Sequence, residues 1–179
     1  MNRSDPSAVS LPPGPHSPAQ AADALLHAIS CDVPPALLEE YGLAGAPEQA
    51  QRIAREVLSL NLFWLAQAFE AHMPAETDQT RLWEALKPRI AAAWTSQWRL
   101  PAADVSAYWE EAEARRAAYD RIVREGGEPM SVFGETADIL EADWVVRGED
   151  RQKLLAFLLD TVPVDEIGDA VEGLDLAPG

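Results

Sequence analysis

His27 and Cys31 are the two side chains whose types and spacing come nearest to a metal site. They stand four positions apart, a spacing that puts two side chains on one face of a helix, and zinc or copper accepts both imidazole and thiolate. A four-coordinate site needs one or two more ligands, and neither His16 nor His72 stands near this pair in the sequence. We therefore predict no bound metal and no cofactor, with a partly buried imidazole and a thiol that packs like a small apolar side chain.

Side chains for acid–base or nucleophilic catalysis are not arranged in any pattern with a known mechanism. Glu70 and His72 are two positions apart, so on a helix they point to different sides. The sequence contains no Gly-x-Ser-x-Gly, no glycine-rich phosphate loop and no His-Glu-x-x-His. Pairs of carboxylates such as Glu141 with Asp143 are typical of a solvated face in so acidic a chain. We predict no catalytic residue, which favours a protein that is not an enzyme without deciding the question.

Aromatic side chains gather between residues 92 and 111, where three of the six tryptophans stand. Trp94 and Trp98 have the spacing of neighbours on one helix face, and Tyr108 and Trp109 follow a turn at Pro101. Two helices joined by so short a turn form a hairpin. The first interpretation is that the rings pack against one another and the rest of the core, because aromatic rings supply large buried areas.

A second interpretation makes the same aromatic cluster a binding site. Arg99, Arg115 and Arg116 stand close to it in the sequence. Rings beside guanidinium groups suit an acidic or planar ligand. The candidate residues for a ligand or partner are therefore Trp94, Trp98, Arg99, Tyr108, Trp109, Arg115 and Arg116.

Apolar residues recur at spacings of three and four along almost the whole chain, and no segment alternates as a strand does. Prolines and capping residues mark helix starts, and glycines mark helix ends. The pattern predicts an all-α fold, a single-domain bundle of six to eight helices. The predicted helices are 18–29, 35–41, 47–73, 78–98 with a kink or break at Pro88, 101–125, 131–147, 149–160 and 165–174.

The predicted helix from Pro47 to the residue before Pro74 is the longest and is apolar nearly all round. A helix of that kind is buried on most sides, so we expect it at the centre of the bundle. Its two apolar stripes are Ile53, Val57, Leu60, Trp64 and Ala68, and Leu58, Leu62, Leu65 and Phe69.

The chain of 179 residues fits one domain. Residues 1–17 are rich in proline and serine and cannot bury enough apolar surface to offset their ordering entropy. We predict a flexible N-terminal tail over 1–17 and a helical domain over 18–179.

Thirty acidic residues against fourteen basic ones give a formal charge of −16. This field repels nucleic acid and anionic membranes and favours a protein partner with a basic surface. Residues 160–179 hold acidic but no basic side chains. They either dock as a small helix or present an acidic segment to a partner. The candidate partner residues of that segment are Asp165, Glu166, Asp169 and Glu172.

Several features favour the cytoplasm of a bacterium. The single cysteine excludes an internal disulfide, the first residues lack the apolar stretch of a secretory signal, and no apolar run is long enough to span a membrane. Abundant arginine and alanine suit a GC-rich bacterial genome. We expect a non-enzymatic helical protein-interaction or regulatory accessory protein. The alternative is a helical binding protein or enzyme with an aromatic-lined pocket between helices for a small apolar or acidic ligand.

Overall fold

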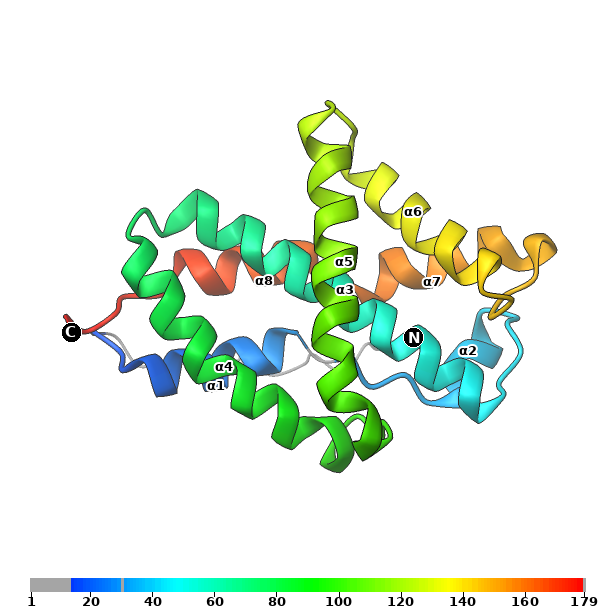
Figure 1. The fold of residues 1–179 in the computed structure, drawn as a ribbon, viewed down its shortest axis with the longest axis horizontal. Coiled ribbons are helices and arrows are strands. Elements are labelled where there is room, and N and C mark those ends of the chain that lie inside the picture. The colour runs from blue at the N-terminus through cyan, green and yellow to red at the C-terminus, as the bar shows by residue number, and fades with distance from the viewer. Residues whose placement is uncertain (1–13, 30, 179) are drawn as a thin grey trace.

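The computed structural model describes residues 14–29 and 31–178, which form eight α-helices and two short 3-10 helices, with no strand beyond one isolated bridge (Figure 1). The predicted all-α bundle around a long central helix is confirmed. The α-helices are α1 (Pro18–Ala28), α2 (Pro35–Glu40), α3 (Pro47–His72), α4 (Glu76–Ser96), α5 (Val105–Arg124), α6 (Pro129–Ala142), α7 (Arg151–Thr161) and α8 (Val164–Glu172). The 3-10 helices, Ala102–Asp104 and Gly148–Asp150, directly precede α5 and α7.

Helices α1, α2 and α3 begin where the sequence predicts, and α8 begins one residue earlier. Ser17 caps α1 through a reciprocal pair of bonds: its hydroxyl accepts from the Gln20 amide, and the Gln20 side chain accepts from the Ser17 amide. Proline occupies the first turn of α1, α2, α3 and α6, where its missing N–H is not needed.

Four predicted helix starts are wrong by two to four residues. Helices α5 and α7 begin at Val105 and Arg151, after short 3-10 helices, rather than at 101 and 149. Helix α4 begins at Glu76 after Ala75, so Thr77 and Asp78 lie inside its first turn rather than at its start. Helix α6 begins at Pro129, which puts Ser131 inside that helix. In α6, the fixed φ of proline starts the helix without help from a capping side chain.

Helix α4 runs through Pro88 without a break. Proline removes the hydrogen bond to the Glu84 carbonyl. Both Pro88 and Glu84 are exposed, so water can bind the carbonyl that proline leaves free. The break that the sequence suggested is therefore absent.

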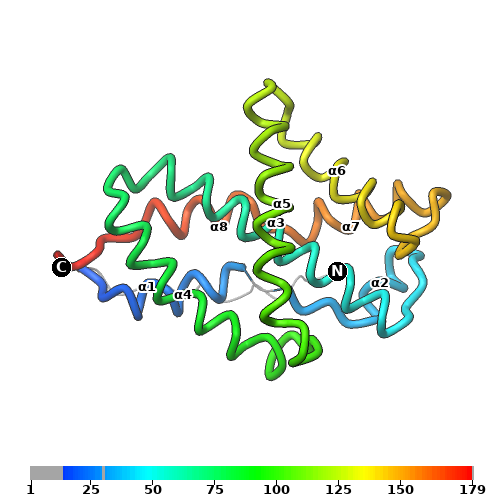
Figure 2. The backbone as a smooth tube through the Cα atoms, viewed as in Figure 1, coloured from blue at the N-terminus to red at the C-terminus, as the bar shows by residue number. Residues whose placement is uncertain are grey.

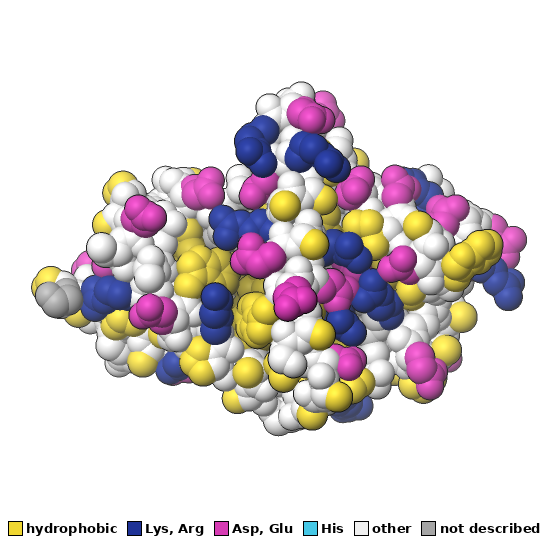
Figure 3. Space-filling view, viewed as in Figure 1, with side chains coloured by type: hydrophobic (Ala, Val, Ile, Leu, Met, Phe, Trp, Pro, Cys, Tyr) yellow, Lys and Arg dark blue, Asp and Glu magenta, His cyan; other side chains and the backbone are white. Residues whose placement is uncertain are grey.

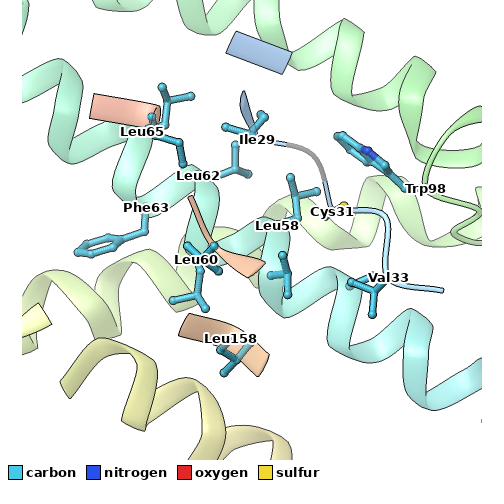
Figure 4. Close-up of a cluster of buried hydrophobic side chains, with 14 of the residues drawn as sticks. Ile29, Cys31, Val33, Leu58, Leu60, Leu62, Phe63, Leu65, Trp98 and Leu158 are labelled. Atoms are coloured by element: carbon cyan, nitrogen blue, oxygen red, sulfur yellow. The ribbon is translucent and has the colours of Figure 1, made fainter. Parts of the chain in front are cut away.

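Helix α3 crosses the whole molecule, and its apolar side chains point to both sides (Figure 4). Leu58 and Leu65 are fully buried, and Leu62 lies close to Ile29 in the same cluster. Only one member of the two predicted stripes, Trp64, is partly exposed. The prediction of a central, buried helix is confirmed.

The other helices cover α3 in two groups, with α5 between them (Figures 1 and 2). Helices α1, α4 and α8 pack together over its C-terminal half. Helices α6 and α7 pair over its N-terminal half, beside the short α2. Helix α5 crosses the front of α3 at a steep angle and contacts both α3 and α6.

The chain packs against itself before the predicted domain boundary at residue 18. His16 is buried, its amide donates to the Asp175 carbonyl at 2.6 Å, and its carbonyl accepts from the Ala177 amide at 2.9 Å. His16, at the end of the predicted tail, therefore lies beside the C-terminal segment. The remainder of that tail, 1–13, lies outside the described residues.

Phe69→Ala should lower the free energy of unfolding by about 3–5 kcal/mol, because truncating a core aromatic leaves a cavity. Phe69 is fully buried on α3 and makes an edge-to-face contact with Trp83 at 5.4 Å. Chemical denaturation measures the change, with Ala71→Ser on the exposed side of α3 as the control. A loss under about 1 kcal/mol would contradict the central place of this helix.

Candidate functional site

The aromatic cluster divides between the core and the surface. Trp94 and Tyr108 are fully buried with ring centroids 4.8 Å apart, and Trp98 is 4% exposed. The Trp94 indole N–H donates to the Pro101 carbonyl at 2.8 Å, which ties the ring to the turn between α4 and α5. These three rings pack in the core where α4 and α5 meet, while Trp109 reaches the surface.

Helices α4 and α5 meet at this turn and then diverge, so they form a V rather than a close antiparallel pair (Figure 2). The space between the two arms is an open groove of about 320 Å³, with α3 as its floor. Apolar side chains are visible in the hollow (Figure 3). Two of the predicted residues, Trp109 and Arg116, line this groove.

Both arms of the V contribute apolar surface to the groove. Trp83 and the stem of Lys87 come from α4, Trp109 and Ala112 from α5, and Phe63 from the floor. Trp83 and Trp109 are partly exposed, which leaves indole surface open to a binding partner. Sequence reasoning missed Trp83, which stands eleven residues before Trp94 and outside the dense cluster.

Charged groups of both signs stand at the rim. The Lys87 ammonium lies 5.8 Å from the Trp109 ring centroid, within the range of a cation–π contact. Arg116 lies 3.7 Å from a carboxylate oxygen of Glu70. Exposed Glu84 and Glu113 line the two opposite walls. The groove thus has an aromatic interior and a charged rim. The side chains of the rim can form ion pairs with acidic or with basic groups of a partner.

Arg115, another predicted site residue, belongs instead to an ion-pair network between α5 and α3. Its guanidinium donates to both carboxylate oxygens of Glu56, at 2.9–3.2 Å, and Glu56 is 0% exposed. Arg52 and Arg55 both donate to Glu111 on α5. The network fixes α5 across α3, and the Arg115 guanidinium is engaged by Glu56.

Arg99 lies in the turn that joins α4 to α5 and is exposed. Its backbone is left-handed, with a φ of 57°, where a helix end usually carries glycine. Arg99 does not line the groove. The predicted group of seven residues is therefore dispersed over the core, the groove, the ion-pair network and this turn.

The acidic C-terminal segment forms helix α8, which docks on α3 and α1. Ile167 and Val171 are buried in that contact. The carboxylates stand on the opposite side, and all four predicted acidic residues are exposed: Asp165, Glu166, Asp169 and Glu172.

His27 and Cys31 do not share a helix face. Helix α1 ends at Ala28, His27 is exposed and Cys31 is buried beyond the helix end. Burial, with a smaller contribution from the Asp32 carboxylate, raises the pKa of the Cys31 thiol well above its usual range. Within the described residues, no three His, Cys, Asp or Glu side chains gather as a metal would require.

Comparison with known proteins gives no relative: no family model, no curated protein and no solved structure matches the chain. None of the described helices has the length and apolar character that crossing a membrane requires.

The floor of the groove continues into two buried tyrosines. The Tyr108 hydroxyl lies 3.1 Å from the Ser59 hydroxyl, and the Tyr119 hydroxyl lies 2.7 Å from that of Thr136. Burial raises the pKa of both phenols, and the nearby Glu56 carboxylate adds to the effect. Each phenol is therefore held neutral in the folded protein.

Raising the pH above about 10 should destabilise the fold, because that is where tyrosine ionises in an unfolded chain. A phenol whose pKa is higher in the folded state contributes stability below the unfolded value, and that contribution is lost as pH rises toward the folded value. Tyrosinate absorbance from Tyr108 and Tyr119 should appear together with loss of helical circular dichroism. Tyr119→Phe is the control, and ionisation of all three tyrosines with the helices intact would contradict their burial.

Proposed function

We propose that this protein is a non-enzymatic interaction protein that binds an apolar segment of a partner protein in the groove between α4 and α5. The observation that carries the proposal is the open, aromatic-walled groove, in which Trp83 and Trp109 remain partly exposed. The bacterial cytoplasm is the setting that we propose, and a regulatory or accessory role is the class of function.

The shape of the groove supports a protein partner rather than a small ligand. Small-molecule sites enclose most of the ligand surface, whereas this groove is open along the V (Figure 3). Open apolar grooves suit an amphipathic helix or a few anchoring side chains of a partner. Tryptophan is also among the residues that most often dominate binding energy at protein interfaces.

The charge of the protein supports a partner with a basic surface. The formal charge of −16 favours approach of a positively charged surface over a distance of roughly 8 Å at physiological ionic strength. The exposed carboxylates of α8 add to this field, as do Glu84 and Glu113 on the groove walls. The partner segment that fits best therefore has apolar side chains flanked by lysine or arginine.

Ala112→Arg should weaken partner binding by about tenfold or more, because a long charged side chain would occupy the groove beside Trp109. The partner is first identified by affinity purification from the native host, and the purified pair is then measured by surface plasmon resonance. Ala117→Arg is the matched control, since it places the same side chain on an exposed position of α5.

Equal affinity of Ala112→Arg and Ala117→Arg for the purified partner would contradict the groove as the binding site. With the native groove, the association rate should fall as salt rises, because steering by charge acts mainly on association. A small molecule that co-purifies in the groove, with no protein partner, would overturn the proposal in favour of a ligand-binding protein.

A further inference from the structure

Trp144 is the most exposed large apolar side chain in the described part of the chain, at 92%. It follows the end of α6, whereas the sequence placed it inside that helix among residues 131–147. Transfer of an indole from water to a protein interior is favourable. The exposed Trp144 side chain therefore stabilises the fold less than a buried indole would.

The backbone at Trp144 is also unfavourable for a large side chain. Its φ is 59°, in the left-handed region that glycine prefers. The turn that closes α6 is well formed: the Val145 amide donates to the Leu140 carbonyl at 2.9 Å, and the Trp144 amide donates to the Glu141 carbonyl at 3.0 Å. Tryptophan at this position is therefore disfavoured both by its exposure and by its backbone conformation.

Carboxylates stand beside the indole. A shallow hollow of about 470 Å³ is lined by Trp144 together with Asp138, Glu141 and Arg147. The loop approaches the Glu141 carboxylate so closely that a Cβ on Gly148 would lie 2.7 Å from its oxygen.

The basic groups near the hollow turn mainly to other carboxylates. Arg151 binds Asp138 at 2.7 Å but lies 3.9 Å from Glu141, and Arg147 turns toward Glu149 at 3.5 Å. Glu141 is thus the carboxylate in the hollow that is least engaged by these two arginines.

We propose that Trp144 is a second contact site, at which the indole stacks on an arginine side chain of a partner protein while Glu141 pairs with its guanidinium. A planar guanidinium stacks on an aromatic face and binds a carboxylate at the same time, which an ammonium does less well. The site does not depend on the groove between α4 and α5, so either site can fail without the other.

Charge favours this occupant over a second copy of the chain. Two copies would each bring a formal charge of −16 to the contact, and like charges oppose association. A segment that carries arginine is instead attracted by the same field.

Two glycine substitutions distinguish an effect on the stability of the fold from an effect on binding at Trp144. Trp144→Gly and Arg99→Gly each relieve a left-handed residue at a helix end, with φ of 59° and 57°. Both should raise the melting temperature by about 2 °C. Only Trp144→Gly removes the proposed contact, so Arg99→Gly is the matched control. A melting temperature that falls in Trp144→Gly, but not in Arg99→Gly, would show that the indole stabilises the fold and would overturn the proposal.

Binding is measured by NMR of the full chain with a synthetic alanine peptide that carries two arginines, at physiological salt. The Trp144 indole N–H signal should shift, and Trp144→Gly should weaken binding by about tenfold, while Arg99→Gly binds as the native protein does. If Trp144→Gly bound the peptide as tightly as the native protein does, the peptide would be attracted by the net charge of the protein and not by the indole. That result would overturn the proposal. A Trp144 shift that depends on protein concentration alone, or tighter binding of a leucine peptide without arginine, would overturn it too.

Discussion

The buried ion pair between Glu56 and Arg115 is the interaction on which the arrangement of α5 depends. Glu56 stands in the middle of the central helix with no exposed surface, where an unpaired carboxylate would be strongly destabilising. The Arg115 guanidinium meets both of its oxygens, and Arg52 lies 3.5 Å away on the same helix. Because α5 carries Arg115, the helix must cross α3 at this point.

The groove follows from that crossing. A helix α5 lying along α4 would bring Trp109 against the α4 side chains and close the space between them. The ion pairs hold α5 across α3 instead, and the Trp94–Tyr108 contact holds the base of the V together. The ion pair between Glu56 and Arg115 therefore keeps the aromatic side chains of α5 apart from those of α4. In this way the buried charges maintain the groove in which we propose that a partner binds.

The sequence predicts the helices and the core well, because prolines, caps and apolar spacing are local signals. It identifies α3 as central, and it leaves open whether the tryptophans near Trp94 are core or surface. That question depends on the angle between α4 and α5, which is set by Glu56 and Arg115, residues 59 positions apart. Trp144 was misplaced because the predicted helix ran through residue 147, whereas α6 ends at Ala142 and a left-handed backbone at Trp144 leaves the indole exposed.

Hydrogen exchange of Glu56→Gln tests the central claim most directly. This substitution keeps the shape of the side chain and removes the charge that Arg115 binds. Amides of α5 should then exchange about tenfold faster or more, while those of α1 and α8, which pack on one another and on α4 and α3 rather than on α5, should exchange as in the native protein. Unchanged protection of α5, or an equal loss of protection in every helix, would contradict the claim that this ion pair holds the wall of the groove.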